Sequence, residues 1–332
     1  MRTMLSPHCS AETAHRFIDA SVFETANVSI GTFRCPVDYP SFRDTGPIER
    51  CLVVFPRTAV WIRHEGRRAF LADPSITTIY NTAQRYERFA ESPQGDRCDW
   101  FGVSDDLARE IVSDFDAPAA GSHRPFRFEW AASPAPLYLR QRALLRRAAA
   151  GDLDRLEGEE EAIEVVTSVI AIAYRSAWRL THTRPTARPR HYELVEAARA
   201  ELLRSVRSNR SVSDIARTIG TSPYHLCRVF SACTGRTLHQ QRTELRLRLA
   251  LEQLEDPAGG NNLSAIAHDL GFCSHSHFVR VMRRYAGVTP SAARALLSLR
   301  KLSVHRRIPG KPPARHGGTL VAAASKTKGI RI

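Results

Sequence analysis

The sequence predicts a multidomain protein, in which a mostly-β N-terminal domain with a helical hairpin precedes an all-α C-terminal domain. Three observations predict this arrangement. Short strand-and-turn patterns dominate before residue 134, an apolar helical period takes over at 135–180, and a pattern that occurs twice fills much of 191–300. A chain of 332 residues is long enough for two domains with a core each.

The β-rich domain is predicted over residues 1–134. The stretch AVWIRHEGRRAFLADPSITTIY, residues 59–80, has three strand-forming segments separated by turns at Glu65–Gly66 and Asp73–Pro74. GDRCDWFGVS, residues 95–104, begins as a turn and continues as another strand. Short strands at this spacing predict a compact domain built as a small barrel or half-barrel.

A helical hairpin is predicted over residues 135–180, with a break near Gly151–Gly158. Apolar residues recur there at helical spacing: Leu137, Leu144, Leu145, Ile163, Val166, Ile170, Ala173 and Trp178. The second helix is apolar over a wide face, which either covers the β-domain or forms a dimer interface. Its apolar surface exceeds what one small domain needs, so we expect a homodimer through residues about 159–180. The residues that carry this expectation are Val165, Val169, Ile170 and Ile172.

Two polar segments delimit the C-terminal domain. THTRPTARPR, residues 181–190, has two prolines, no acidic residue and no apolar period, which is typical of an interdomain linker. The helical domain is expected to span residues 191–300. Residues 301–332 combine Gly, Pro, Lys and Arg without an apolar repeat, so a disordered basic tail is expected there.

The excess of basic over acidic residues is confined to the C-terminal part of the chain. Residues 1–190 hold 25 basic and 25 acidic residues, 191–300 hold 15 and 9, and 301–332 hold 8 and none, within a net charge of +14. Such asymmetry indicates a polyanionic partner, and nucleic acid is favoured because no apolar run is long enough to cross a membrane. Without a signal peptide pattern either, we expect a cytoplasmic protein.

The internal repeat explains the helical domain. Residues 212–237 and 263–289 share a serine, an Ile-Ala pair, a glycine, an Arg-Val pair and a Gly-x-Thr end. Ser213 and Ser264 are expected to cap a short helix, which ends at Gly220 or Gly271 in a left-handed turn. A second cap then opens a longer helix. Helix, glycine turn and helix make a helix-turn-helix motif, whose second helix enters the DNA major groove.

A single helix is expected to link the two motifs. TLHQQRTELRLRLALEQLED, residues 237–256, has leucines along one face, while Arg242, Arg246 and Arg248 are expected to face solvent. About 18 helical residues span roughly 27 Å. Because successive major grooves on one face of a duplex lie roughly 34 Å apart, one chain could place both motifs in adjacent grooves.

The polar start of the second recognition helix, CSHSHFVR at residues 273–280, suits contact with base edges. His275 and His277 are poor joint metal ligands, because side chains two apart on a helix point about 200° apart. Seven scattered cysteines without a C-x-x-C pair favour reduced thiols over a metal site or a disulfide framework. We therefore expect no metal, no cofactor and no catalytic residue.

Residues about 192–298 resemble the AraC/XylS family of bacterial transcription regulators. IAHDLGFCSHSHFVRVMRRYAGVTPSAAR, residues 266–294, follows that family's signature almost throughout. Ser222 and Ser274 match positions near phosphate in the family, and a further set matches positions that face bases: Tyr224, Cys227, Arg228, His275, Ser276 and Arg280. His225 and Arg283 complete the candidate DNA-binding residues. Cys227 replaces a longer polar residue, so the first motif is expected to read fewer bases.

The N-terminal part resembles the cupin-like effector or dimerisation domains of the same family, on FLADPSITTIYNTAQRYERF, residues 70–89, and GDRCDWF, residues 95–101. No spaced His/Glu set marks a cupin metal site, so neither metal nor ligand is carried over. The resemblance implies a sequence-specific DNA-binding transcription regulator, which we expect to be an activator. Its partners would be double-stranded DNA, a small-molecule effector, a second copy and, as a further candidate, RNA polymerase.

Two alternatives use the same DNA-binding module. A cupin-type enzyme would need a metal triad, paired carboxylates or a Ser-His-Asp set, and only the weak combination of His64, Cys98 and Asp99 is present. A cysteine-based DNA alkyl-transfer repair protein would need a reactive cysteine set. Cys35, Cys51 and Cys98 lack the expected close spacing.

Overall fold

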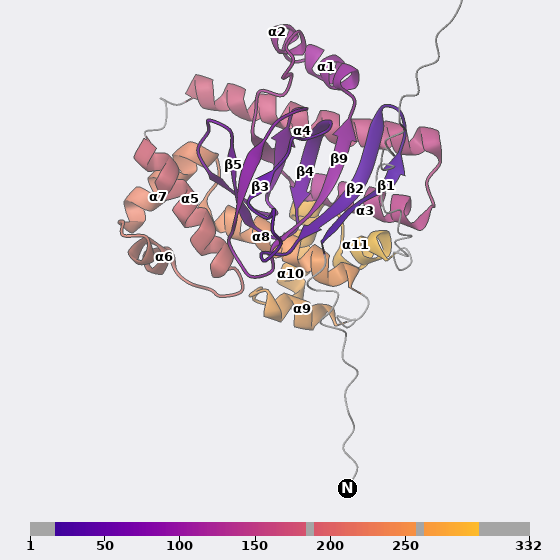
Figure 1. Cartoon of the computed structure of the whole chain (residues 1–332). Coiled ribbons are helices and arrows are strands. Elements are labelled where there is room, and N and C mark those ends of the chain that lie inside the picture. The colour runs from indigo at the N-terminus through magenta and orange to yellow at the C-terminus, as the bar shows by residue number, and fades with distance from the viewer. Residues whose placement is uncertain (1–16, 184–188, 257–261, 299–332) are drawn as a thin grey trace, which may run out of the picture.

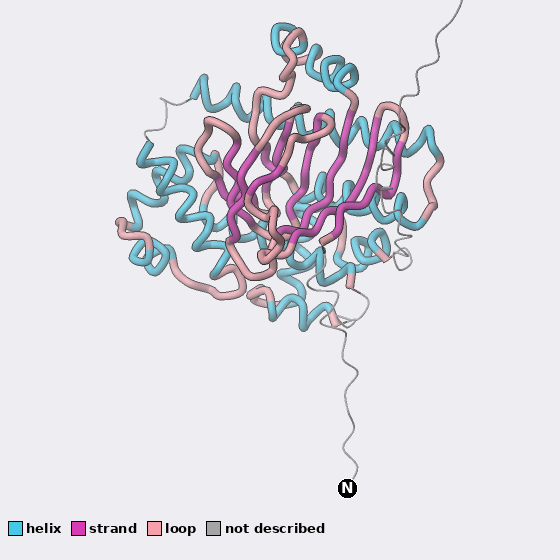
Figure 2. Tube along the Cα trace, viewed as in Figure 1, coloured by secondary structure: helices cyan, strands magenta, loops and turns pink. Residues whose placement is uncertain are grey.

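The computed structural model of the chain describes residues 17–183, 189–256 and 262–298. Its N-terminal half holds two antiparallel sheets, which Figures 1 and 2 show together with the helices that surround them. The large sheet has the strand order β1-β2-β9-β4-β7-β10, and the small sheet the order β3-β8-β5-β6. The strands are β1 (Ile18–Glu24), β2 (Val28–Cys35), β3 (Asp44–Thr45), β4 (Cys51–Pro56), β5 (Val60–His64), β6 (Phe70–Ala72), β7 (Ile76–Tyr80), β8 (Tyr86–Ala90), β9 (Asp96–Val103) and β10 (Trp130–Ala132).

The strands predicted within this domain are confirmed. The three strands expected within residues 59–80 are β5, β6 and β7, and the turn at Glu65–Gly66 places Gly66 at a φ of +71°. The strand expected after Gly95 is β9. Alternation along the strands separates two cores, one between the sheets and one between the large sheet and the helices.

Four helices accompany the sheets: α1 (Asp105–Ser113), α2 (Ala117–Ala120), α3 (Ala135–Ala150) and α4 (Arg155–Thr183). The expected hairpin is formed by α3 and α4, and Gly151 ends α3 in the left-handed conformation. α4 packs on β2, β9 and β10 of the large sheet. The helix therefore covers the β-domain, which is the first of the two roles its apolar face allowed.

The apolar residues expected to be surplus are already used inside the chain. Val165, Val169 and Ile170 are buried against the β-domain, and only Ile172 is half-buried. The expectation that these side chains form a free dimer face is wrong for the three buried ones, because they pack against the β-domain. A homodimer itself stays a prediction, without these residues as its interface.

The described residues of the C-terminal part form seven helices: α5 (Pro189–Arg204), α6 (Val212–Thr218), α7 (Pro223–Thr234), α8 (Leu238–Glu255), α9 (Leu263–Asp269), α10 (His275–Ala286) and α11 (Pro290–Leu297). The predicted linker at 181–190 overlaps the ends of α4 and α5, and its middle, 184–188, lies outside the described residues, as does the predicted tail at 301–332. None of the described helices is both long enough and apolar enough to cross a membrane.

The two motifs have different cores. The first is built on its own cluster, in which Ile215, Leu226 and Phe230 pack with residues of α5 and with Leu245 of α8. The second belongs to the same cluster as the large sheet and the hairpin, where Phe278 and Met282 join α3 and the C-terminal half of α8. α10 and α11 contact α3 directly. The linker helix α8 thus joins both cores.

Two sequence expectations about helix starts need correction. α6 is capped by Ser211 and α9 by Asn262, so each cap lies two residues before the expected cap, Ser213 or Ser264. Asp214, three residues after Ser211, accepts from the Ser211 backbone and completes a capping box that fixes this start. The expected left-handed turns are confirmed, with φ of +71° at Gly220 and +73° at Gly271.

The linker helix also differs from the expectation. Arg246 and Arg248 are buried and Arg242 is half-buried, so the expectation that all three face solvent is wrong. The Arg248 guanidinium donates to the carbonyl oxygens of Pro74 and Ser133, and Arg246 donates to that of Val206 at 2.8 Å. α8 is surrounded by structure on several sides, so its arginines satisfy buried carbonyl groups instead of water.

Candidate nucleic-acid interface

The first recognition helix, α7, presents a polar first turn to solvent. The Ser222 hydroxyl accepts from the backbone N–H of His225 at 3.2 Å and starts the helix. Tyr224 is 78% exposed, which is unusual for a large aromatic side chain. Cys227 and Arg228 are exposed as well, while His225 makes an edge contact with His191 of α5. Three of these candidate DNA-binding side chains are therefore accessible together.

The second recognition helix, α10, is arranged in the same way. The Ser274 hydroxyl accepts from the backbone N–H of His277 at 3.1 Å, as predicted for a cap. Its exposed face carries four of the predicted residues, and these line a shallow hollow together with Val279: His275, Ser276, Arg280 and Arg283. The opposite face, with Phe278 and Met282, is buried. An amphipathic helix of this kind can be inserted into a groove without disturbing its core.

Arg280 and Arg283 are available for an anionic partner. Asp269, the only acidic residue close in sequence to them, is held by Arg207 and by the Gln253 amide at 2.9 Å. Within the described ranges neither Arg280 nor Arg283 has an ion pair or a hydrogen bond from its side chain. Guanidinium groups in this state can bind phosphate or the O6 and N7 atoms of guanine without first breaking a salt bridge.

No group of three or more potential metal ligands occurs among the described residues. His277 is half-buried and its ring makes an edge contact with Phe272, whereas His275 is exposed. The two histidines thus have different surroundings, which matches their expected divergence on the helix.

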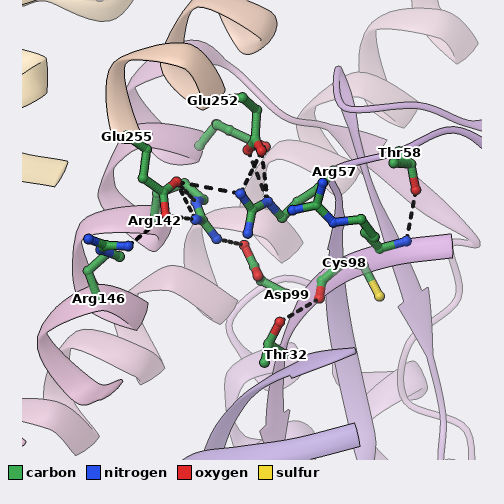
Figure 3. A network of polar contacts seen from close by, with 11 residues as sticks. Thr32, Arg57, Thr58, Cys98, Asp99, Arg142, Arg146, Glu252 and Glu255 are labelled. Carbon is green, nitrogen blue, oxygen red and sulfur yellow. Dashed lines mark hydrogen bonds and ion pairs between the residues drawn. The ribbon is translucent and has the colours of Figure 1, made fainter. Parts of the chain in front are cut away.

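A buried polar network, which the sequence did not predict, ties α8 to the β-domain (Figure 3). The Arg57 guanidinium, just after β4, donates to both oxygens of Glu252 on α8, with Nε–Oε distances of 3.0 Å. Arg142 of α3 bridges Asp99 of β9 and Glu255 of α8. Charged side chains from α3, α8, β9 and the end of β4 thus meet here, with Arg142, Asp99 and Glu255 buried and Arg57 and Glu252 half-buried.

The electrostatics of this network follow from its composition. Burial alone would raise the pKa of Glu252, but the nearby Arg57 and Arg142 outweigh burial and lower that pKa to about 2. Tyr138 of α3 adds a hydrogen bond to Glu252 at 3.1 Å, and Arg146 one to Glu255 at 3.1 Å. Because buried charges are costly without partners, these groups hold one another in place.

Further contacts connect α5 and the start of α8 to the same domain. Arg199 of α5 pairs with buried Asp73 at 2.7 Å, and Glu196 accepts from the backbone N–H of Leu71 at 2.7 Å. Gln241 of α8 donates to the hydroxyl of Ser75, also at 2.7 Å. The helices that carry both motifs are consequently fixed against the β-domain along their length.

The sequence signal for these contacts was weak. Charged residues on helices such as Glu252 and Arg142 ordinarily lie on solvated faces, and nothing in a single sequence distinguishes the buried minority. One sequence feature was informative: α8 combines many charged residues with many leucines. Its leucines therefore occupy several faces of the helix, and no face is left that is suited to solvent alone.

Comparison with known proteins supports the assignment of the helical part. Residues 215–296 match the model of a helix-turn-helix domain. The chain is similar to the uncharacterized HTH-type transcriptional regulator YidL of Escherichia coli, with 35% identity over 98 residues, which is 30% of this chain and 32% of that protein. The chain therefore spans about a third of the length of the curated relative that it matches.

Solved structures give a weaker likeness. ToxT from Vibrio cholerae O395 is 13% identical, over 82% of this chain and 97% of that chain, with a TM-score of 0.32. An AraC-type regulator from Chromobacterium violaceum is 26% identical, over 32% of this chain and 93% of that chain, with a TM-score of 0.30. The family match and the two motifs carry the conclusion: residues 215–296 are a helix-turn-helix domain, similar to part of a bacterial HTH-type transcriptional regulator.

Proposed function

We propose that this protein is a sequence-specific DNA-binding transcription regulator that inserts α7 and α10 into the major groove. One observation carries the proposal: a single chain presents two helix-turn-helix motifs, each with an exposed polar face on its second helix. On α7 the reading face would be Tyr224, His225, Cys227 and Arg228, and on α10 His275, Ser276, Arg280 and Arg283. Ser222 and Ser274 would lie near phosphate.

The linker helix sets the spacing of the two motifs. α8 has 18 residues, which corresponds to roughly 27 Å of helix. Successive major grooves on one face lie roughly 34 Å apart, so two helices mounted near its ends suit adjacent grooves of one duplex. A monomer would then read two segments of DNA from the same side.

The β-domain is proposed to control this spacing. Its contacts with α5 and α8 fix both motifs, so a small-molecule effector that favoured another arrangement of the β-domain would change DNA affinity. We further propose that the regulator is an activator that works in the cytoplasm, with RNA polymerase as a partner. Pairing of two copies would raise avidity on repeated half-sites without new base contacts.

The cysteine-based repair alternative receives no support from the thiols. Burial raises the pKa of Cys35 and of Cys98, and it raises that of Cys51 to about 11. The thiolate is the reactive form, so these buried thiols are poor nucleophiles at neutral pH.

Selection from a randomised duplex library with the full chain tests the proposed function. We expect one enriched motif with two conserved segments, each lost separately in Arg228→Ala and Arg280→Ala. Arg109→Ala, which removes an exposed arginine of α1, serves as the charge-matched control and should keep the full motif. Recovery of no enriched sequence, at a salt concentration where binding is measurable, would reject sequence-specific recognition.

A further inference from the structure

A cavity of about 410 Å³ lies in the β-domain, and none of the residues that line it belongs to a recognition helix. Its walls are the turn after β5 and the segment that precedes β10, and Asn81 fixes that segment. The Asn81 amide donates to the carbonyl oxygen of Phe126 and accepts from its backbone N–H, both at 2.9 Å. The cavity therefore has a defined wall on each side.

Two buried polar atoms beside this cavity have no hydrogen-bond partner among the described residues. His64 is 4% exposed, and its Nε2 has no hydrogen-bond partner in the described part of the chain. Its Nδ1 lies 3.6 Å from Oε1 of Glu129, a buried oxygen that also has none there. Buried polar atoms are normally satisfied, so an unpaired donor-acceptor pair in a cavity wall indicates a missing polar partner.

The rim of the cavity is basic. Arg67 and Arg124 line it and are exposed, and within the described residues no hydrogen bond or ion pair occupies either guanidinium. Arg127, the third arginine of the lining, is paired with Asp116 at 3.0 Å. Glu65, the one exposed acidic residue of the rim, leaves an excess of positive charge there.

Apolar side chains also line the cavity. Ile79, Phe126 and Phe128 contribute to the lining. Burial and Arg67 lower the pKa of His64 to about 4, so the imidazole is neutral at physiological pH and can both donate and accept. The cavity thus offers guanidinium donors, apolar side chains and a neutral imidazole beside a buried carboxyl oxygen.

We propose that this cavity binds a small carboxylic acid that carries a hydroxyl group at the far end of an apolar body. The carboxylate would meet Arg67 and Arg124, and the hydroxyl would bond with His64 and Glu129. Such a ligand satisfies every unpaired group of the site at once, whereas a simple anion or a simple alcohol satisfies only one end.

The helix that leads into the first motif, α5, contacts residues that neighbour the cavity wall in sequence. The Tyr192 hydroxyl of α5 donates to the carbonyl oxygen of Ala69 at 3.2 Å, and the Arg199 guanidinium lies 6.0 Å from the ring of Trp130, the residue after Glu129. Ligand binding would therefore change the position of α5. This last step rests on the proposed regulatory function, whereas binding itself does not.

Calorimetry on the full chain without DNA tests the site, with 6-hydroxyhexanoate as probe. Hexanoate lacks the hydroxyl and 1,6-hexanediol lacks the carboxylate, so they are the matched controls. We expect saturable binding of the probe, and each control should bind about tenfold more weakly, the factor that corresponds to the loss of one charged or buried hydrogen-bonding partner.

Variants assign the binding to this cavity. Arg124→Gln, an exposed position that the fold does not need, and Arg67→Gln should each weaken the probe about fivefold to tenfold, as for one charged hydrogen bond. Arg109→Gln should leave binding unchanged, and His64→Phe should abolish the preference for the probe over hexanoate. Equal binding of all three molecules, or wild-type binding by both arginine variants, would overturn the site.

A gel shift with the selected DNA separates the site from its proposed role. A change in DNA affinity on adding the probe, lost in Arg124→Gln, supports ligand control of the regulator. Binding in the expected order without any effect on DNA supports the site and contradicts the coupling through α5.

Discussion

The two helix-turn-helix motifs are copies of one pattern, yet they are held in different surroundings. Ile215, Leu226 and Phe230 of the first motif pack with α5 and α8 in a cluster of their own, so this motif is connected to the β-domain through those two helices. Phe278 and Met282 of the second pack in a cluster that continues through α3 to the large sheet. A sequence repeat specifies the motif, but the side chains around it decide whether it moves independently.

The reading faces differ too. α10 presents His275, Ser276 and two arginines, whereas α7 presents an exposed tyrosine and Cys227, whose thiol is a weak hydrogen-bonding group. The second motif, which is anchored to the β-domain, therefore also carries the stronger hydrogen-bonding surface. We expect it to provide most of the base recognition, with the first motif adding affinity.

The largest effect is expected from breaking the anchor of the second motif. Arg142→Met would leave Asp99 and Glu255 buried without their common partner and should destabilise the protein by about 3–5 kcal/mol. Arg140→Met, which removes an exposed pair with Glu164 on the same helix, should cost about 0–1 kcal/mol. Denaturant unfolding measures both, and similar small losses would show that the network does not hold the domains together.

Matched core truncations should separate the motifs next. Leu226→Ala and Met282→Ala each remove a fully buried side chain, with an expected loss of about 2–5 kcal/mol. Hydrogen exchange should rise in α5 to α8 for the first variant, and in α10, α11 and α3 for the second. Faster exchange confined to α9 to α11 in Met282→Ala would contradict the shared core.

Arg280→Ala should affect DNA binding and leave the fold intact. Arg280 is exposed and makes no contact with the buried face of α10, so we expect a loss of about 1–3 kcal/mol in specific binding. Gel shifts at fixed salt give this value, thermal unfolding should be unchanged, and Arg109→Ala is the control. Unchanged DNA affinity would remove Arg280 from the interface.

The smallest effect is expected at the first reading face. Cys227→Ala should change specific affinity by less than about 1 kcal/mol, because a thiol is only a weak hydrogen-bonding group. Ser276→Ala, at an exposed position of α10, should cost more. The reverse order in the same gel-shift assay would mean that the first motif dominates recognition.

Much of the fold was predictable from local patterns. The strands at 59–80, the hairpin, the glycine turns and the caps at Ser222 and Ser274 all follow from short-range signals of a few residues. The caps of α6 and α9 were misplaced by two residues. At α6 the reason is that Ser211 and Ser213 are the same residue type, so either could serve as the cap. Only the reciprocal bond with Asp214 distinguishes them.

What escaped prediction depends on long-range packing. Arg248 and Glu252 are of residue types that ordinarily lie on a solvated helix face. They are covered by the β-domain and α3, more than a hundred residues away in sequence. Val169 could face a partner or the sheet, and only the arrangement of strands decides. His64 and Glu129, which lie next to each other in the cavity wall, likewise come from two segments that no local pattern connects.

Guanine methylation interference on the selected duplex tests the central claim most directly. If both recognition helices of one chain enter adjacent grooves, interfering guanines should fall in two clusters about 10 base pairs apart on one face of the DNA. Arg280→Ala should erase one cluster and Arg228→Ala the other. A single cluster that both substitutions weaken equally would contradict the placement of the two recognition helices in adjacent grooves.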